Sequence, residues 1–417
     1  MTGKEWRNVA CTLYAGGNYF AAVAAFLRAQ SLGEDDGEFH REFAVALWSA
    51  NDRDSAMAQM HKAQEKDRGS FAIAATLSNF LAALGEPAGA AKWLSHALAI
   101  TPDDPQARMN RALYLIASGD WERGWREYDA RLDLYPIDFP GNAIPIWKGN
   151  ASIDGKLVWV SCEQGLGDQI MFSRYVPWLQ AQGASVIFDS HGTLGDFSFA
   201  GDVITRTMGP AGKWKVPVHP ATDRKPDYHI PLMSLPSRHR TTQANVPPAP
   251  KWYKVASEPF HVTLPGDESK KKIGLVWAGS KDHAGDHLRS MPLQSLLPIT
   301  GDDRCEFYSF QVGERCLDIK NTGAEPLIRV LNLSNWMVTA ACLRQLDALV
   351  TVDTAAAHLA GSLGVKTFLM LSTEPDFRWG MTGDTTPWYP SVNLIRQHAR
   401  GDWARVVRRI ATEIEEL

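Results

Sequence analysis

The sequence predicts an α-helical repeat array followed by an α/β region built on parallel sheets. Two observations support this fold class. Short turns recur every 34 residues in the first third of the chain, and beyond residue 153 short apolar runs alternate with helical patterns. A length of 417 residues is typical of two or three domains. We therefore expect a helical domain over residues 1–134 and two α/β domains over residues 135–260 and 261–417.

Four turns that start at residues 17, 51, 85 and 119 set the repeat period. Five positions after each turn start stands a small residue, and nine positions after it stands a large one. The small residues are Ala22, Ala56, Ala90 and Gly124, and the large ones are Phe26, Met60, Leu94 and Tyr128. Small side chains beside large ones at fixed columns are typical of paired helices that interlock. This region resembles a tetratricopeptide-repeat array of about three repeats with a last helix over residues 121–132.

Such arrays stack into a curved solenoid, and the concave face of a solenoid often binds peptides. The repeats therefore predict a partner protein, but they fit equally well with a scaffolding or dimerising surface. Both interpretations stay open at this point, and a homo-oligomer is compatible with either.

Composition excludes several classes of function. The chain has 43 Lys and Arg against 47 Asp and Glu, a net charge of -4 that a nucleic-acid-coating or polybasic membrane-surface protein would not carry. Its five cysteines are scattered and form no C-x-x-C pair, which suits a reducing cytoplasm. No apolar run reaches the roughly 18 residues of a membrane span, and the run over residues 20–27 fits a repeat helix better than a signal peptide. We expect a cytoplasmic protein without a transmembrane segment.

A connector and a series of short strands follow the repeats. Residues 135–153 contain three prolines and two glycines without a helical period, and a second break falls at the proline-rich residues 246–250. The predicted strands are residues 157–162, 185–189, 273–277, 306–311, 348–352, 367–371 and 393–396, and the clearest helices are residues 169–182 and 402–416. Strands that alternate with helices favour two parallel-sheet halves with a cleft between them. Because ligands bind beyond the carboxyl ends of parallel strands, the loops there are the places to look for chemistry.

The first such loop holds Gly165, Gly167 and Asp168 between a strand and a helix. Ile170 occupies the position of the third glycine, so the dinucleotide-binding fingerprint fails. The two glycines would still let the backbone approach a ligand. Asp168 is either a helix cap or a general base, because a helix N-terminus lowers a carboxyl pKa whereas a base working near neutrality needs a raised one.

The second loop runs from Asp353 through Thr354 and Ala355 into an alanine-rich helix. Free backbone amides of the first turn and the Thr354 hydroxyl can donate to a diphosphate. His358 stands four residues after Thr354, so the imidazole shares that face of the helix. The alternative for His358 is a packed, hydrogen-bonded structural histidine.

A third loop follows the strand at residues 273–277. Gly279 and Ser280 are small, and Lys281 and Arg289 bring positive charge that would neutralise a phosphate leaving group.

The same loop contains His283 and His287, each preceded by an aspartate at a spacing that resembles metal ligands. That interpretation requires a helix, and Gly285 in a polar loop argues against one, so we predict no metal site.

Aromatic residues and an amide complete the candidate set. Arg378, Trp388 and Tyr389 lie in loops beyond a strand and suit stacking on a base or sugar ring, with packing over the core as the alternative. Gln311 ends the predicted strand at residues 306–311.

Taken together and in this order, six segments resemble bacterial tetratricopeptide-repeat glycosyltransferases, whose catalytic part is similar to the heptosyltransferases of glycosyltransferase family 9. The segments are residues 163–168, 227–236, 274–279, 289–293, 353–360 and 388–390. The resemblance implies a GT-B fold of two Rossmann-like α/β domains, with the acceptor on the amino-terminal half and a nucleotide-sugar on the carboxy-terminal half. It implies Asp168 as the base and places Asp353, Thr354 and His358 in the donor-phosphate loop. The chain departs from heptosyltransferases in carrying repeats and in having Ala355 where they usually have glycine.

The expected function is a metal-independent, inverting glycosyl transfer that uses a nucleotide-sugar as donor and no further cofactor. Asp168 would remove the acceptor proton, while the Thr354 helix end and His358, with Arg289 or Lys281, stabilise the departing diphosphate. Gln311 and the loop at residues 388–389 would hold the nucleoside. The repeats would present the acceptor, a protein such as flagellin or another surface polypeptide, or else a surface glycan. The rivals are a non-catalytic partner-binding protein that senses nucleotide-sugar and a GT-B-like epimerase that needs no acceptor.

Overall fold

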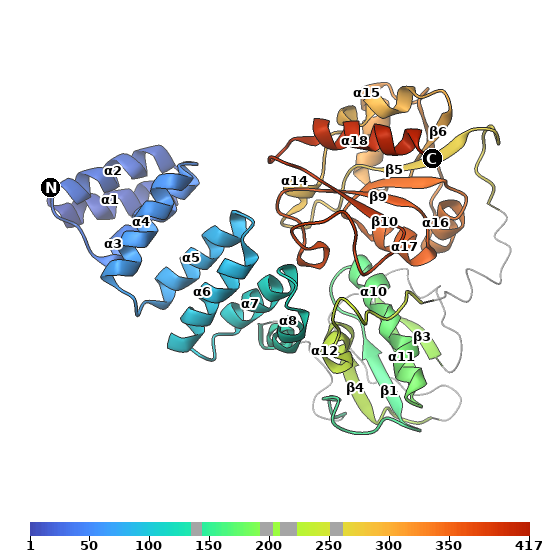
Figure 1. Cartoon of the computed structure of the whole chain (residues 1–417), viewed down its shortest axis with the longest axis horizontal. Helices are drawn as coiled ribbons and strands as arrows, with labels where there is room; N and C mark the ends of the chain where they lie inside the picture. The colour runs from blue at the N-terminus through green and yellow to red at the C-terminus, as the bar shows by residue number, and fades with distance from the viewer. Residues whose placement is uncertain (135–143, 192–202, 209–222, 251–261) are drawn as a thin grey trace. The chain divides into compact units, whose positions relative to one another are not determined.

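The computed structural model describes residues 1–134, 144–191, 203–208, 223–250 and 262–417. Contacts divide the chain into two compact units, Met1–Tyr135 and Pro136–Leu417, which we call the repeat unit and the α/β unit. Figure 1 shows helices alone in the repeat unit and helices around parallel sheets in the α/β unit. This is the predicted fold class.

Four helix pairs build the repeat unit (Figure 1). The pairs are α1 (Gly3–Ala15) with α2 (Tyr19–Ser31), α3 (Gly37–Ser49) with α4 (Arg53–Lys66), α5 (Phe71–Ala83) with α6 (Pro87–Ile100), and α7 (Pro105–Ala117) with α8 (Trp121–Glu127). The turns inside the pairs carry Gly17, Asn51, Gly85 and Gly119, whose φ angles are 77°, 65°, 80° and 94°. Glycine and asparagine tolerate this left-handed conformation, and this explains why those residue types recur there.

The residue that follows each left-handed turn residue makes the hydrogen bonds that close the first helix of the pair and start the second. Its backbone N–H donates to the carbonyl five residues earlier, at 2.9 Å in the first three turns and 2.8 Å in the fourth. In the first, second and fourth turns its side chain also caps the following helix: Asn18 accepts from the Ala21 amide, Asp52 from that of Ser55 and Asp120 from that of Arg123. The 34-residue period is thus a repeat of hydrogen bonds.

The predicted alternation of small and large residues at fixed repeat positions is confirmed, because all four small and all four large residues are buried. At Gly124 even a methyl group would lie 2.6 Å from Ile116 Cγ1. Two expectations need correction. The turn at Gly119 closes a fourth helix pair, and the expected last helix over residues 121–132 is divided into α8, the 3-10 helix η1 (Tyr128–Ala130) and α9 (Arg131–Leu134).

The first sheet of the α/β unit has four parallel strands in the order β3-β2-β1-β4. They are β1 (Leu157–Ser161), β2 (Ser185–His191), β3 (Val203–Met208) and β4 (Tyr228–Pro231). The helix predicted over residues 169–182 is broken into α10 (Leu166–Phe172), the 3-10 helix η2 (Ser173–Tyr175) and α11 (Val176–Ala181). Pro177 has no N–H to continue the helical hydrogen bonds across this point.

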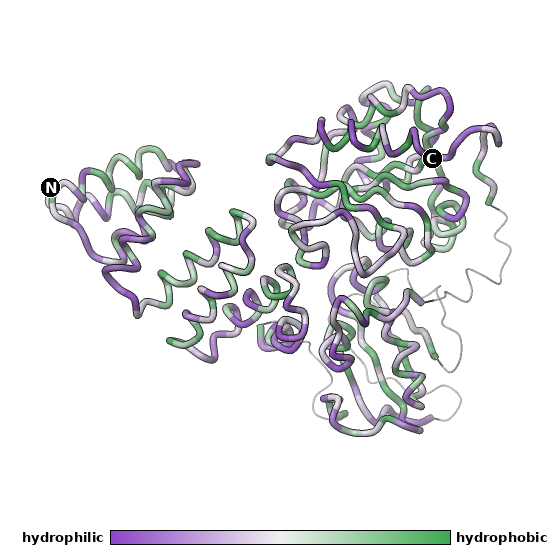
Figure 2. Tube along the Cα trace, viewed as in Figure 1, coloured by the Kyte–Doolittle hydropathy of each residue, from purple (hydrophilic) through white to green (hydrophobic). Residues whose placement is uncertain are grey.

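The second sheet has six parallel strands in the order β10-β9-β8-β5-β6-β7. They are β5 (Lys271–Val276), β6 (Cys305–Ser309), β7 (Ile328–Val330), β8 (Ala348–Val352), β9 (Thr367–Leu371) and β10 (Val392–Arg396). Figure 1 shows this sheet between α15 (Asp318–Thr322) and α18 (Trp403–Glu415) on one side and α16 (Trp336–Leu343) and α17 (Ala355–Leu363) on the other. The hydrophobic colour of Figure 2 runs along these strands, and β8 and β9 are buried throughout.

Short elements connect the strands. They are η4 (Leu232–Ser234), α12 (Leu235–His239), α14 (Asp286–Arg289), η5 (Leu293–Ser295), η6 (Leu297–Gly301), η7 (Glu314–Leu317) and η8 (Phe377–Trp379). All seven predicted strands are confirmed, whereas β3, β4 and β7 were not predicted. The predicted connector lies outside the described residues up to residue 143, and beyond it Trp147 donates its N–H to His229 of β4 at 2.8 Å.

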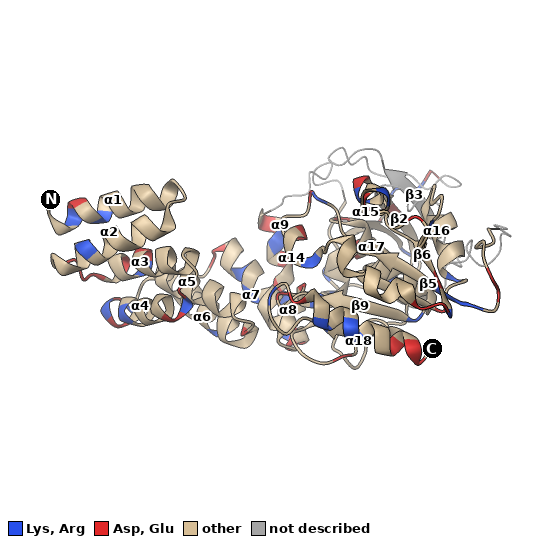
Figure 3. Ribbon diagram, turned by 90° about the horizontal axis from the view of Figure 1, so that it is seen from above, with Lys and Arg blue, Asp and Glu red and all other residues tan. Residues whose placement is uncertain are grey.

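Charge is concentrated on the helix surfaces, as Figure 3 shows for α18, where arginines precede glutamates along the helix. Of the helices in the described ranges, none combines the length and hydropathy that crossing a membrane requires.

Candidate functional site

The candidate residues lie where β1, β5, β6, β8 and β9 end. The strands in each sheet are parallel, so the loops that follow them emerge at one edge of that sheet. The helices α10, after β1, and α17, after β8, contact each other. The loops of both sheets therefore meet at this point.

Asp168 lies in the first turn of α10 and combines the two roles that the sequence left open. Its Oδ2 accepts the Gly165 N–H at 3.0 Å, which is a capping contact, and its Oδ1 pairs with the Arg378 guanidinium. The side chain is 13 % exposed. Burial raises the pKa of Asp168, and the charge of Arg378 acts in the opposite direction. A carboxyl of this kind has the raised pKa that a base requires, and its catalytic role stays a prediction.

Gly167 is required by the close approach of α10 to α17. A Cβ atom there would lie 2.8 Å from His358 Cδ2 and 3.6 Å from the Ala355 Cα. A glycine predicted to contact ligand therefore also makes room for a helix contact.

His358 is packed inside the α/β unit. It is 3 % exposed, its Nδ1 lies 3.1 Å from the Tyr389 hydroxyl, and its ring stacks on Trp379 with centroids 5.1 Å apart. Burial, reinforced by the charges of Arg378 and Arg174, lowers the pKa of His358 well below its usual range. The imidazole is neutral near pH 7, which favours the structural alternative over a cation that would stabilise a diphosphate.

Asp353 follows the last residue of β8, stands just before Thr354, the N-cap residue of α17, and is 8 % exposed. Burial, with a contribution from the charge of Asp376, raises the pKa of Asp353 to about 6, although Arg378 and Arg289 act in the opposite direction. The sequence placed Asp353 in the donor loop but did not predict a carboxyl that titrates near neutrality. The signal that could have revealed it is its position directly after β8, a strand that is buried throughout.

Thr354 is the N-cap residue of α17, but its side chain does not cap the helix. Its hydroxyl lies 3.2 Å from the Thr351 hydroxyl instead. Ala355 begins the helix, and the Ala357 N–H already donates to the Thr354 carbonyl at 3.1 Å. The amides of Ala355 and Ala356 come before the first intrahelical hydrogen bond, so they are the donors that an anion could use. This is the geometry that the predicted anion site needs.

Trp388 and Tyr389 are 1 % and 0 % exposed, so both rings belong to the core, the alternative that the sequence left open. Arg174 of η2 holds them: its NH1 donates to the Trp388 carbonyl at 2.9 Å, and its guanidinium lies 4.9 Å from the Tyr389 ring centre. The side chain of Arg174 is 1 % exposed, and its NH2 nitrogen has no hydrogen-bond partner among the described residues. Sequence reasoning missed Arg174, because the Trp388 and Tyr389 that it contacts stand more than 200 residues away along the chain.

Gln311 follows β6 and is a backbone clamp. Its Oε1 accepts the N–H groups of Trp277 and Ala278 at 3.1 and 2.9 Å, and its Nε2 donates to the carbonyls of Ala278 and Val312. Both polar atoms of the side chain are engaged in this arrangement, and the contact of Gln311 with a nucleoside stays a prediction.

The loop after β5 and α14 frames a pocket of about 440 Å³. Its lining is Lys281, His283, Ala284, Asp286, His287, Ser290, Met291, Pro292 and Arg315. Ser290 accepts the Gly279 N–H at 2.9 Å, and Arg289 lies 3.2 Å from Asp286. A Cβ at Gly279 would lie 2.5 Å from Arg289 NH2, so glycine is needed there. Four cationic or titratable nitrogen groups against one carboxylate make this pocket suited to an anion.

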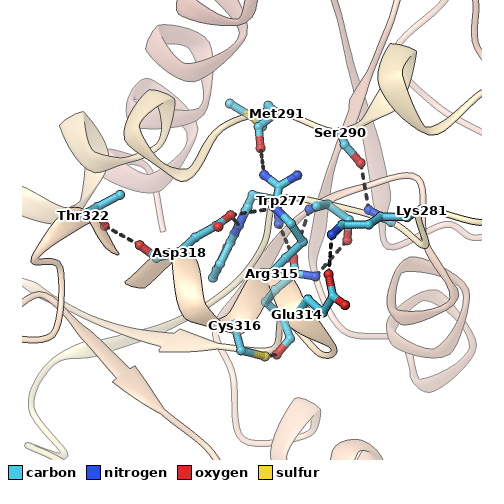
Figure 4. A network of polar contacts seen from close by, with 12 residues as sticks. Trp277, Lys281, Ser290, Met291, Glu314, Arg315, Cys316, Asp318 and Thr322 are labelled. Carbon is cyan, nitrogen blue, oxygen red and sulfur yellow. Dashed lines mark hydrogen bonds and ion pairs between the residues drawn. The ribbon is translucent and has the colours of Figure 1, made fainter. Parts of the chain in front are cut away.

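Arg315 was not anticipated and is held firmly at this pocket (Figure 4). Its Nε donates to Asp318 at 2.7 Å, its NH2 donates to the Met291 carbonyl at 3.2 Å, and the Trp277 indole donates to the same aspartate at 2.8 Å. Lys281 pairs with Glu314 at the surface, where both side chains are mostly exposed.

The residues predicted from sequence thus form two neighbouring groups. One contains Gly165, Gly167, Asp168, Asp353, Thr354, Ala355, His358, Arg378, Trp388 and Tyr389, and the other contains Gly279, Ser280, Lys281, Arg289 and Gln311. The charge of Arg289 lowers the pKa of Asp353, so the two groups lie within electrostatic reach. Within the ranges that the structure covers, no three His, Cys, Asp or Glu residues come together as a metal site.

A tetratricopeptide-repeat model matches residues 47–114. The repeat unit is a tetratricopeptide-repeat array. The chain is 22 % identical to protein FlbA of Caulobacter vibrioides, and the match covers 92 % of this chain and 73 % of that protein.

Solved structures similar to this chain include glycosyltransferases. A family 9 glycosyl transferase from Veillonella parvula is 12 % identical with a TM-score of 0.43, covering 65 % of this chain and 92 % of that one. An O-GlcNAc transferase from Thermobaculum terrenum is 14 % identical with a TM-score of 0.33, covering 99 % of this chain and 92 % of that one.

Proposed function

We propose that this chain is a glycosyltransferase that moves a sugar from a nucleotide-sugar to an acceptor hydroxyl. The observation that carries the proposal is the position of Asp168, a buried carboxyl with a raised pKa, beside the first turn of α17. A base and an anion-binding helix end side by side are what a displacement at a sugar carbon next to a diphosphate requires.

In this mechanism Asp168 takes the proton of the acceptor hydroxyl while the hydroxyl oxygen forms a bond to the anomeric carbon of the donor sugar. The bond from that carbon to the diphosphate breaks, and the carbon inverts. The negative charge left on the diphosphate would be met by the first amides of α17, by Thr354 and by the cations Arg289 and Lys281. Neutral His358 positions the Tyr389 hydroxyl rather than supplying charge. No metal or further cofactor takes part.

The donor is expected to extend into the 440 Å³ pocket, where the cations Lys281 and Arg315 would contact its phosphates. We propose that the acceptor is a polypeptide such as flagellin, held by the tetratricopeptide repeats, with a surface glycan as the alternative acceptor. Both substrates would be met in the cytoplasm.

The test is a binding panel followed by a transfer assay. UDP, GDP, ADP, dTDP and CMP are titrated into the full chain while its unfolding temperature is recorded. A ligand at 100 times its Kd stabilises the fold by about 2.7 kcal/mol. One nucleotide that stabilises selectively identifies the base, and Arg315→Ala should remove that effect whereas Arg409→Ala, on the surface of α18, should not. No stabilisation by any nucleotide overturns the proposal.

A second candidate is a non-catalytic protein that binds nucleotide-sugar and recruits a partner. The observation in its favour is that both carboxylate oxygens of Asp168 are already engaged, one by Arg378 and one by Gly165. It predicts donor binding without hydrolysis or transfer, so turnover of the bound nucleotide-sugar separates the two candidates.

A further inference from the structure

Arg378 lies in η8, after β9, and ties this loop to α10 of the first sheet. Its NH2 pairs with Asp168 Oδ1, and its NH1 lies 3.0 Å from Asp376 Oδ1. The arginine side chain is 10 % exposed, so water has little access to this ion pair. The two partners stand 210 residues apart in the sequence.

The Arg378 guanidinium interacts with several carboxyl groups. Its positive charge lowers the pKa of both Asp168 and Asp353, against the burial that raises them, while the negative charge of Asp376 raises both. A diphosphate that approaches α17 brings further negative charge into this group of acids. The repulsion falls if a cation turns towards the diphosphate or if a carboxyl takes up a proton.

The guanidinium lies close enough to α17 to bind a ligand there. A Cβ atom placed on Gly167, the neighbour of Asp168, would be 3.6 Å from the Ala355 Cα. The ion pair of Asp168 with Arg378 therefore lies beside the first turn of that helix. A guanidinium presents parallel N–H donors that match two phosphate oxygens, and a phosphate competes well with a carboxylate for such a fork.

We propose that Arg378 exchanges partners when the donor binds: it leaves Asp168 and donates to the diphosphate at the N-terminus of α17. This inference rests on the proposed function and adds a regulatory step to it. Before the donor binds, Asp168 is held by Arg378 and cannot accept a proton from a hydroxyl. After the exchange Asp168 is released as the base. The donor therefore binds before the acceptor, and Arg378 is a positioning residue for Asp168.

The exchange has a proton signature. Asp168 faces Arg378, Asp376, Glu163 and the Gly165 N–H. When the one cation of this set turns to the ligand, the remaining negative charges raise the proton affinity of the Asp168 carboxyl. Ligand binding at about pH 6 should then be accompanied by proton uptake that depends on Asp168.

Calorimetry with inorganic pyrophosphate tests this without knowledge of the base. The full chain is titrated in buffers of different ionisation enthalpy, and the number of protons taken up is compared between the native protein and Asp168→Asn. The difference removes the protonation of pyrophosphate itself. We expect the native protein to take up more protons, by at most about one per ligand. Equal uptake in the two proteins overturns the exchange.

Affinity gives the second measurement. Arg378→Gln should weaken pyrophosphate binding by about tenfold or more, the loss of a charge-assisted hydrogen bond. Arg378→Lys, which keeps a cation in place, is the second variant if Gln destabilises the fold, and it should bind with intermediate affinity. Arg409→Gln, which removes an arginine from an exposed pair with Asp384, is the matched control and should bind normally. Native affinity in both Arg378 variants overturns the proposal.

The two proposals fail in different ways. If neither pyrophosphate nor any nucleoside diphosphate binds the native chain, the proposed function is wrong and the exchange is wrong with it. If a ligand binds but Asp168 contributes no proton uptake, only the exchange is wrong.

Discussion

The repeat unit and the α/β unit each bury a histidine, and they treat it differently. In the repeat unit, His40 has a partner at each ring nitrogen, Gln59 at 2.6 Å and Asp35 at 2.9 Å, both within 19 residues of it in the sequence. In the α/β unit, His358 has the Tyr389 hydroxyl at 3.1 Å, while its other nitrogen is 4.0 Å from Asp353. The pKa of His358 is strongly lowered by burial.

The partners of His40 come from nearby segments of the repeat unit, whereas Asp168 and Arg174 of the α/β unit have partners more than 200 residues away in the sequence. Asp168, Asp353 and Arg378 are partly compensated charges that a simpler core would not contain. Such groups cost stability, and they cluster where ligands bind. The comparison teaches that the partly compensated charges gather in the α/β unit, where the proposed function places the chemistry.

The sharpest test of this division is the loss of the carboxylate at Asp168. Asp168→Asn should lower kcat for transfer by about 10²- to 10⁴-fold, the contribution of a general base, while nucleotide binding is retained. The measurement is single-turnover transfer at saturating donor.

Asp376→Asn is the matched control, since it removes the other carboxylate that pairs with Arg378. It should keep turnover within about tenfold. Near-native turnover in Asp168→Asn would show that Asp168 is only a cap.

The next largest effect is the pH dependence of stability that Asp353 imposes. Its pKa is about 6 in the folded protein against 3.8 for an unperturbed aspartate, so the folded chain binds the proton more tightly. Stability from this group is therefore present at about pH 4 and is lost as the pH rises to about 6, by up to about 3 kcal/mol. Asp353→Asn should exceed the native protein in unfolding temperature by an amount that grows from pH 4 to pH 7.

The opposite sign is expected of Asp384. A hydrogen bond from Arg409 lowers the pKa of Asp384, so this pair stabilises the fold above the unfolded pKa and the benefit is lost as the pH falls. Asp384→Asn should therefore be less stable than the native protein near pH 7 and equal to it in acid. A parallel pH profile for the two variants would contradict the assignment of Asp353.

A smaller effect is expected where α10 touches α17. Gly167→Ala puts a methyl group 2.8 Å from His358 Cδ2 and should destabilise the α/β unit by about 1–3 kcal/mol, measured by denaturant unfolding. Gly16→Ala in the repeat unit is the control: φ is -80° and the nearest atom is 3.5 Å away, so it should be stabilising by about 0.4–1 kcal/mol. A neutral Gly167→Ala would mean that the two helices separate readily.

The smallest effect concerns the exposed surface of α2 in the repeat unit. Phe20 and Leu27 on α2 are 79 % and 54 % exposed, and the second repeat has Asp54 and His61 at the same columns. Phe20→Asp and Leu27→His should change stability by no more than about 0.5 kcal/mol. Phe26→Ala, in the buried column, should cost about 3–5 kcal/mol. A large loss in Phe20→Asp would show that this face is covered.

Much of the fold could be predicted from the sequence because its signals are local. The turn at Asn51 and Asp52, for example, contains both the left-handed residue and the cap of the next helix. Five-residue buried strands such as β8 were equally clear. The short strands were not: β7 has three residues and β4 ends in Pro231, so neither carries a measurable alternation. Pro177 was the visible signal for the broken helix after β1.

The candidate site divides in the same way. Asp168, Asp353 and the α17 helix end could be recognised by their place after strands, because that place depends only on the order of elements. The partnership of Asp168 with Arg378, and that of Arg174 with Trp388, could not be recognised, since no local pattern links residues more than 200 positions apart. The same holds for Gln311 and Tyr389, whose residue types suited a ligand but whose polar atoms are bound inside the protein.

The sequence by itself therefore determined the period of the repeats, the alternation of strands with helices and the loops in which chemistry is to be sought, because each can be read from the local order of turns, helices and strands along the chain. Only the tertiary structure decided which of those residues are buried, which carboxyls have raised pKa values and which cation they share. The physical reason is that desolvation and Coulomb interaction depend on distance in space, and that distance is set when the two sheets bring the ends of their strands together.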